Sequence, residues 1–266
     1  MDILTHTLTG AAAGTVAASF LRGGAGRQTS IVLLSALGGA LPDVDALSLW
    51  SGFDATIGRW LNLQHSGHSI YFSTFWYSHH GFMHSLAAAL LLIVAGWAVA
   101  SVFSSMRGAS PALAGKLKHK ILPASGFAGG YILAILEDMP TPSGVWGGVR
   151  FWWPSGTYIG GTGDIWWWNN YDLFLIVAAV VILNILLLLI LRTSPLKRLM
   201  PALVMLVGLG LFLYQIHGRD MDFNYHEYRP NPAQLEQQSL QLQQELLGPR
   251  LYGIMHRFDE KLPVAF

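Results

Sequence analysis

Residues 173–191 read LFLIVAAVVILNILLLLIL, a run in which Asn184 is the only polar side chain. An α-helix needs about 20 mainly apolar residues to cross the hydrocarbon core of a bilayer, which is about 30 Å thick. A second long apolar run extends from Leu86 to Phe103. These two runs predict an integral membrane protein built from α-helices.

The composition of the whole chain agrees with this prediction. Of 266 residues, 52% are hydrophobic and 12% are charged, with a mean hydropathy of +0.41, whereas about a quarter of the residues of a soluble domain are charged. The formal net charge of +1 provides no basic surface for a phosphate backbone, which argues against nucleic acid as the main partner. Because the chain contains no cysteine, any bound metal must be held by His, Asp or Glu.

Six apolar segments are expected to form an all-α, polytopic bundle. They span residues 4–21, 30–41, 82–104, 121–137, 172–191 and 199–217. The second is short and ends at Pro42, so we expect it to tilt or stop within the membrane. The first begins with Asp2 as the only charge before Arg22, which predicts a retained helix and not a cleaved signal peptide.

The distribution of Lys and Arg predicts the orientation of the bundle, because short cytoplasmic loops retain positive charge. Alternate loops contain Arg22, Arg27, Arg107, Lys116, Lys118, Lys120, Arg192, Lys197 and Arg198. The loops on the other side, 42–81 and 138–171, contain only Arg59 and Arg150. We therefore expect the N-terminus and both long loops on the outer face of the inner (plasma) membrane. An interfacial aromatic belt is expected from Trp146, Trp152, Trp153, Trp166, Trp167 and Trp168.

Two regions are predicted, a membrane-embedded helical domain (1–217) and an extramembrane tail (218–266). In the tail, Asn231 and Pro232 indicate the start of a helix, and Gly248 indicates its end. Leucines recur on one face between these points, at Leu235, Leu242 and Leu246. The tail is therefore expected to contain an amphipathic helix that serves packing or lies at the membrane interface.

Candidate metal ligands gather at one predicted membrane boundary, at the ends of four separate segments. They are His6, Asp43, Asp45, His79, His80, His84, Glu137 and Asp138. Imidazole nitrogens and carboxylate oxygens brought together from separate elements suit a divalent cation. Ionisable residues at membrane depth are costly and usually functional. The sequence therefore predicts a metal site at this boundary.

The carboxylates of this group admit two interpretations. After Pro42, Asp43 and Asp45 can turn toward one cation, or one of them can cap a helix while the other is solvated. Glu137 and Asp138 close an apolar segment, where they require a cation, a hydrogen-bond donor or a shifted pKa unless that helix end is solvated.

The histidines also leave alternatives open. His80 and His84 are four residues apart, a known zinc spacing if the helix has already begun. Otherwise His79 approaches from the loop and His84 from the first turn of the helix. Interfacial histidines without a metal are the alternative, although three histidines in six residues are hard to explain by packing. His65 and His68 are either extra ligands or, more simply, part of a polar loop.

Several motifs together resemble the YdjM-like family of membrane-bound metal-dependent hydrolases, over about residues 1–155. They are TH at 5–6, LPDVD at 41–45, HHGFMHS at 79–85, LED at 136–138, TPSGV at 141–145 and WP at 153–154. The resemblance implies hydrolysis with a divalent metal, zinc before manganese or magnesium. It also implies a phosphoester substrate, because the family is grouped by similarity with zinc-dependent phospholipase C and P1-type nucleases.

The resemblance carries the family's site residues onto His6, Asp43, Asp45, His79, His84 and Asp138. Two positions depart from the family pattern: His80 stands where the family has Arg, and Ala134 stands where it has a His. Glu137 shares a helix face with residues 134 and 138 and offers a replacement ligand. Its harder oxygen would shift the metal preference from zinc toward manganese or magnesium.

The expected function is therefore a membrane-bound metal-dependent hydrolase that acts on a phosphoester of a lipid or lipid-linked substrate at the outer face. Asp43 or Asp45 is the candidate general base, provided that it stays out of the inner shell of the metal. The alternative is a non-catalytic membrane protein that binds or transports the metal, and the missing His at position 134 favours this alternative slightly.

Overall fold

The computed structural model describes residues 2–21, 24–106, 113–141, 148–163, 165, 170–219 and 232–261. Within these ranges the chain is helical and forms no strand, although Val149 and Ile159 pair in an isolated antiparallel bridge. The all-α prediction is confirmed for this part of the chain.

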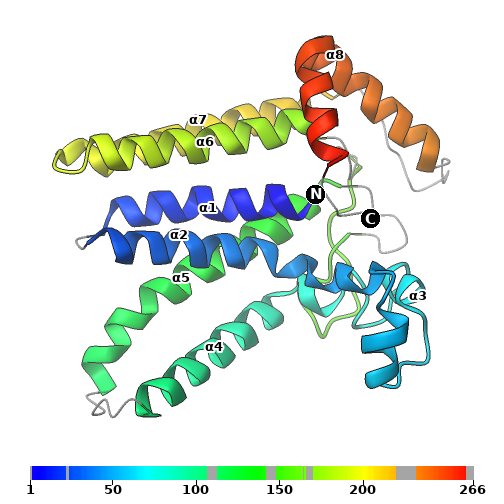
Figure 1. The fold of residues 1–266 in the computed structure, drawn as a ribbon, viewed down its shortest axis with the longest axis horizontal. Helices are drawn as coiled ribbons and strands as arrows, with labels where there is room; N and C mark the ends of the chain where they lie inside the picture. Colours follow the sequence, from blue (N-terminus) through cyan, green and yellow to red (C-terminus); the bar gives the residue numbers. More distant parts are fainter. Residues whose placement is uncertain are drawn as a thin grey trace.

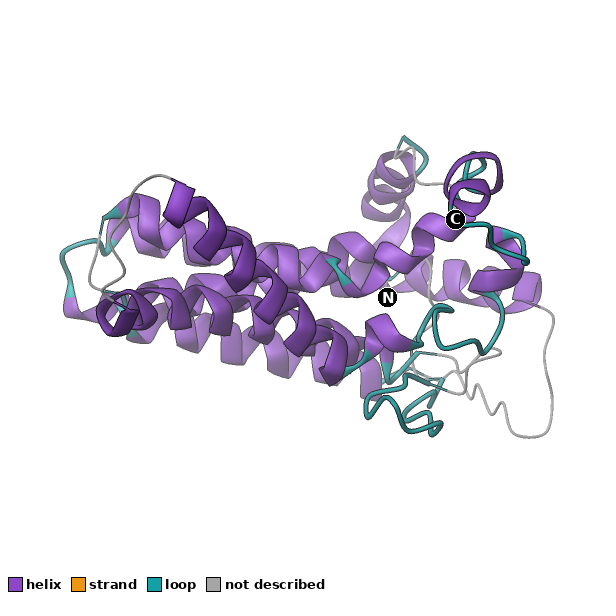
Figure 2. Cartoon of the chain, turned by 90° about the horizontal axis from the view of Figure 1, so that it is seen from below, coloured by secondary structure: helices purple, strands orange, loops and turns teal. Residues whose placement is uncertain are grey.

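The long helices form an elongated bundle (Figures 1 and 2). They are α1 (Ile3–Ser19), α2 (Ala25–Ala40), α4 (Leu86–Met106), α5 (Leu113–Asp138), α6 (Tyr171–Ile190) and α7 (Leu199–His217). Helices α1, α2 and α5 contact one another at the centre of the bundle. Helix α6 packs on α1, and α7 packs on α6. Helix α4 packs on α5.

Some helices extend beyond the apolar segments from which they were predicted. Helix α2 begins at Ala25 and α5 at Leu113, whereas their apolar segments begin at residues 30 and 121. Backbone hydrogen bonding continues through the polar residues that precede each segment. Helix α4 begins later than expected, at Leu86, because Phe82–His84 forms the separate 3-10 helix η3.

Some of the described helices are long and apolar enough to cross a membrane. Tyr171–Ile190 has a mean hydropathy of 3.3, and Pro195–His217, which joins the 3-10 helix η4 (Pro195–Lys197) to α7, has 2.0. Helix α2 and the 3-10 helix η1 (Pro42–Leu49) qualify together as a pair bent by 50°. The bend lies at Pro42, where the sequence predicted a tilt or a stop. The described residues thus contain two or three candidate spans, and six crossings remain a prediction.

Glycines allow the three central helices to approach backbone to backbone. A Cβ added to Gly10 would lie 2.2 Å from the Ser35 carbonyl oxygen, and one added to Gly39 would lie 2.1 Å from that of His6. A Cβ on Gly130 would lie 2.0 Å from the Ser35 oxygen. Small residues permit such close packing in membrane bundles. This packing brings the start of α1 beside the last turns of α2 and α5.

The long connection after α2 is folded. It contains η1, the π-helical turn η2 (Asp54–Gly58) and the short helix α3 (Gly67–Tyr71). The Asp54 carboxylate accepts a hydrogen bond from the Gly67 backbone N–H at 2.6 Å and so ties η2 to α3. In the second long connection Trp152 is exposed, while four tryptophans of the expected aromatic belt lie outside the described residues: Trp146, Trp166, Trp167 and Trp168.

The tail forms the helix α8 (Pro232–Asp259), which begins at the predicted residue. The first helical stretch ends at Gly248, as predicted. Gly248 interrupts the helix with φ 71° and ψ 161°, and a second helical stretch follows because Pro249 suits the first position of a helix. The Gln243 side-chain oxygen accepts a hydrogen bond from the Asp172 backbone N–H at 3.1 Å, so the tail packs on α6.

Candidate metal centre

The start of α1 is set by a capping residue. The Asp2 carboxylate accepts hydrogen bonds from the Thr5 backbone N–H at 2.9 Å and from the Thr5 hydroxyl at 2.7 Å. Such a cap satisfies N–H groups that have no partner within the helix. His6 therefore lies in the first turn of α1, and its side chain is fully buried.

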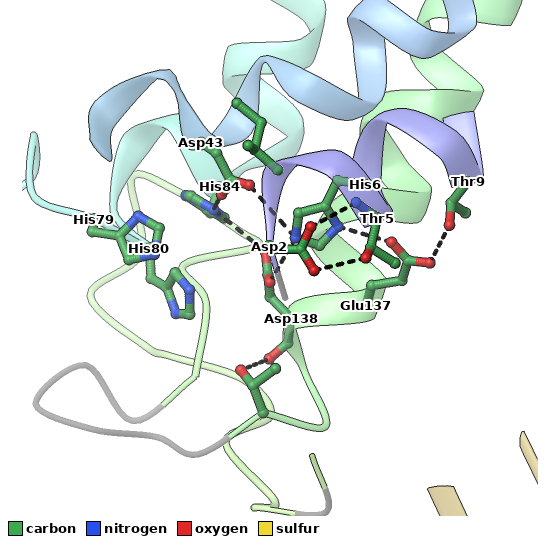
Figure 3. Close-up of polar contacts among 12 residues, drawn as sticks. Asp2, Thr5, His6, Thr9, Asp43, His79, His80, His84, Glu137 and Asp138 are labelled. Atoms are coloured by element: carbon green, nitrogen blue, oxygen red, sulfur yellow. Dashed lines mark hydrogen bonds and ion pairs between the residues drawn. The ribbon is translucent and has the colours of Figure 1, made fainter. Parts of the chain in front are cut away.

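Carboxylates face both ring nitrogens of His6 (Figure 3). Nδ1 lies 2.8 Å from Glu137 Oε2, and the other Glu137 oxygen accepts a hydrogen bond from the Thr9 hydroxyl at 2.5 Å. Nε2 lies 3.0 Å from Asp138 Oδ1 and 3.7 Å from Asp43 Oδ2. The ring thus separates Glu137 on one side from two aspartates on the other.

His84 repeats this arrangement from the opposite side. Its Nε2 atom lies 3.4 Å from Asp43 Oδ1 and 3.4 Å from Asp138 Oδ2. Its Nδ1 atom lies 3.3 Å from Asp45 Oδ2. The two histidines therefore direct their Nε2 atoms at the same pair of aspartates, and each has a further carboxylate at Nδ1.

The atoms at the centre of this cluster fit a divalent cation. One ligand atom each of His6, Asp43 and Asp138 lies within 4.8 Å of the others. Among the residues that the structure describes, none offers a hydrogen-bond partner to the buried ring nitrogens of His84 or to Asp43 Oδ2. Buried polar atoms of this kind are costly unless something binds them. Two imidazoles and two carboxylates are a ligand set that zinc accepts.

His79 lies beside this centre and is held by two neighbours. Its Nδ1 atom lies 2.7 Å from Asp45 Oδ1, and its ring stacks on Tyr71 with centroids 4.4 Å apart. Burial raises the pKa of the Tyr71 hydroxyl, and the negative charges of Asp45 and Asp43 raise it further. Tyr71 thus lies within the electrostatic influence of the same aspartates.

His80 occupies a turn and not a helix. Its φ is 59°, and its Nδ1 atom donates a hydrogen bond to the Gly148 carbonyl at 3.0 Å. Burial lowers its pKa well below the ordinary value, and the nearby His79 and His84 lower it further. The shared helix face proposed for His80 and His84 is therefore wrong, because α4 begins only at Leu86. The three histidines still form a second group with ligand atoms within 4.8 Å of one another.

The structure brings all seven residues predicted to hold a metal into one region. They are His6, Asp43, Asp45, His79, His84, Glu137 and Asp138. His65 and His68 are exposed; His65 lies in a loop as expected, whereas His68 lies in α3. The sequence analysis did not identify Thr9 or Tyr71. The position of Thr9, three residues after His6 on one helix face, was a usable signal, whereas nothing in the sequence singled out Tyr71.

Comparison with known proteins agrees with this picture. The YdjM inner membrane protein family matches residues 1–219. The chain belongs to this family. No curated protein and no solved structure matches it significantly. The YdjM match covers the whole cluster and ends before α8, and the similarity to zinc-dependent phospholipase C and P1-type nucleases remains a prediction.

Proposed function

We propose that the chain is a metal-dependent hydrolase of the inner membrane. Its substrate is a phosphoester of a lipid or lipid-linked molecule, and its cofactor is a divalent cation, zinc before manganese or magnesium. The observation that carries this proposal is the convergence of two imidazole Nε2 atoms on two buried aspartates. Convergent nitrogen and oxygen ligands from separate helices are typical of metal sites.

The geometry favours a division of roles among the predicted residues. His6, Asp43, His84 and Asp138 are the proposed ligands. Glu137 faces His6 Nδ1 at 2.8 Å, and Asp45 faces His84 Nδ1 at 3.3 Å. A carboxylate behind a metal-binding imidazole fixes its tautomer and orientation. Glu137 and Asp45 are therefore proposed to orient the two histidines.

Of the two candidate general bases, Asp45 is the one that would stay out of the inner shell of the metal. Both oxygens of Asp43 face histidine Nε2 atoms, so this residue would serve as a ligand of the ion. Asp45 lies on the far side of His84 and pairs with His79 at 2.7 Å. When bound, a divalent cation lowers the pKa of water and stabilises charge on a substrate oxygen. Asp45 and His79 would hold the proton that the attacking water releases.

The proposed site lies at the end of the bundle opposite the basic loops. The connection between α6 and α7, which carries Arg192 and Lys197, lies at the far end of the bundle from the N-terminus of α1 (Figure 1). If the chain crosses the membrane six times with the basic loops inside, the N-terminus and the site would lie on the outer face. Lipid headgroups are the substrates within reach there.

Reporter fusions test this orientation. A fusion after Arg107 is expected to report the cytoplasm, and a fusion after Gly160 is expected to report the exterior, because basic loops stay inside. The paired activities of alkaline phosphatase and green fluorescent protein fusions measure both locations. The reverse pattern would contradict the outer-face assignment.

The proposed activity is tested on the purified full-length chain. Metal content is measured by mass spectrometry, and turnover is measured on a chromogenic phosphodiester and on phospholipid, before and after chelation. We expect bound metal, metal-dependent turnover, and loss of turnover with retained metal in Asp45→Asn. Bound metal without turnover on either substrate would instead support the binding or transport alternative.

The role of Glu137 can be measured separately. Glu137→Gln is expected to weaken metal binding by roughly 10 to 100-fold while leaving the number of bound ions unchanged, as for other residues behind a ligand. Asp138→Asn, which alters a proposed ligand, should reduce the stoichiometry. Titration against a competing chelator measures both quantities, and Glu245→Gln on the exposed side of α8 is the matched control. A lower number of bound ions in Glu137→Gln would instead indicate that Glu137 is itself a ligand.

A further inference from the structure

The second stretch of α8 exposes a row of apolar side chains, here called the C-terminal stripe. Leu251, Ile254 and Phe258 are 39%, 48% and 46% exposed, respectively. They are three and four residues apart, so they lie on one face of the helix. Such a face on a solvated helix normally indicates a binding surface.

Basic residues run alongside the C-terminal stripe. Arg250, Arg257 and Lys261 are all exposed, and their spacings of seven and four residues place them in one row next to the stripe. The acidic residues of this stretch have partners. Asp259 accepts a hydrogen bond from the Tyr171 hydroxyl at 2.8 Å, and Glu260 lies 3.5 Å from His256. The exposed side therefore presents apolar groups beside three cations.

The rest of this stretch is docked on the start of α6, and Phe258 at the end of the stripe also approaches α6, with its ring centroid 6.1 Å from that of Phe174. Besides the bond from Tyr171 to Asp259, the rings of Tyr171 and Tyr252 lie 5.8 Å apart, and Met255 is buried. Because α6 is a candidate membrane span, its first turn lies at a membrane boundary. In Figure 1 the red end of α8 runs across the axis of α6, at the end of the α6 and α7 pair.

We propose that residues 249–261 form an interfacial helix that binds an anionic lipid surface. A helix that lies across a span at the boundary runs along the membrane plane. Its apolar row can then enter the acyl boundary while its cations meet lipid phosphates, as in other interfacial helices. This surface lies outside the residues matched by the YdjM family and goes beyond the proposed hydrolysis, since it does not depend on a metal.

The absence of cysteine from the chain permits a direct test with single-site labels. An environment-sensitive NBD fluorophore is attached to the new cysteine of Ile254→Cys. The control is the same label on Gln237→Cys, an exposed polar site in the first stretch of α8. The full-length protein is reconstituted into nanodiscs of phosphatidylcholine alone or mixed with phosphatidylglycerol. We expect emission at residue 254 to shift to shorter wavelength than at residue 237, and to shift further with phosphatidylglycerol. Equal emission at both sites would overturn the proposal.

Charge neutralisation separates lipid binding from contact with a second protein copy. The triple variant Arg250→Gln, Arg257→Gln, Lys261→Gln should lose the additional shift caused by phosphatidylglycerol. The control triple variant Arg192→Gln, Lys197→Gln, Arg198→Gln removes equal charge at the other end of the bundle and should keep it. If the first triple variant kept the additional shift caused by phosphatidylglycerol, the proposed binding of anionic lipid by these three cations would be overturned. A shift that disappears at one protein per disc would assign the stripe to a second copy and overturn the proposal.

Discussion

Replacement of His84 by alanine is expected to remove the bound metal while the bundle remains folded. His84 directs Nε2 at both Asp43 and Asp138, at 3.4 Å each, so its loss takes one of four proposed ligands. The affinity should fall by more than the roughly 100-fold limit of a residue that only orients a ligand.

Metal occupancy and thermal unfolding report this loss independently. A ligand present at 100 times its dissociation constant stabilises the folded state by about 2.7 kcal/mol. Wild-type protein should therefore gain thermal stability when the metal is added, and His84→Ala should not. His217→Ala, at the exposed end of α7, is the matched control and should behave as wild type. Full occupancy in His84→Ala would remove His84 from the ligand set.

The second large effect is expected at the glycine contact between α2 and α5. A Cβ in Gly130→Ala would lie 2.0 Å from the Ser35 carbonyl oxygen, a backbone atom that cannot rotate away. Helices α2 and α5 must then separate, at a cost of about 1–3 kcal/mol as for other overpacked sites. Because Asp43 follows α2 and Asp138 ends α5, the same separation should weaken metal binding.

The neighbouring glycine provides an unusually close control. Nothing lies within 4 Å of a Cβ added to Gly129, so Gly129→Ala should be neutral or stabilise the helix by about 0.5–1 kcal/mol. Both variants are compared by thermal unfolding in detergent and by chelator competition. Equal stabilities would show that α2 and α5 do not approach as closely as the structure indicates.

The helices were predictable where apolar composition and helix length coincide. The predicted segments 172–191 and 199–217 differ from α6 and α7 by no more than a residue at their starts and ends. The starts of α2 and α5 were not predictable from hydropathy, because a helix continues as long as its backbone hydrogen bonds do. The continuation of α8 past Gly248 depended on Pro249, which starts a new helical stretch.

The site shows the same division between sequence and structure. Residue type and position along the chain were enough to gather His6, Asp43, His84 and Asp138 at one predicted depth. They did not separate ligands from orienting residues, and Glu137 was expected to replace a missing ligand. In the structure Glu137 faces the Nδ1 atom of His6, while Asp138 faces Nε2. Which ring nitrogen meets which carboxylate depends on the rotation of each side chain within the packed bundle.

The sequence by itself was enough to indicate a helical membrane protein and to predict that His and Asp residues gather at one depth, because hydrophobic length and charge are properties of local segments. Only the tertiary structure decided how those residues meet. Glycine contacts hold α1, α2 and α5 within backbone distance, and this approach brings His6 to carboxylates more than 100 residues away. The docking of α8 on α6 through Asp259 and Tyr171 is likewise a contact that only the tertiary structure shows.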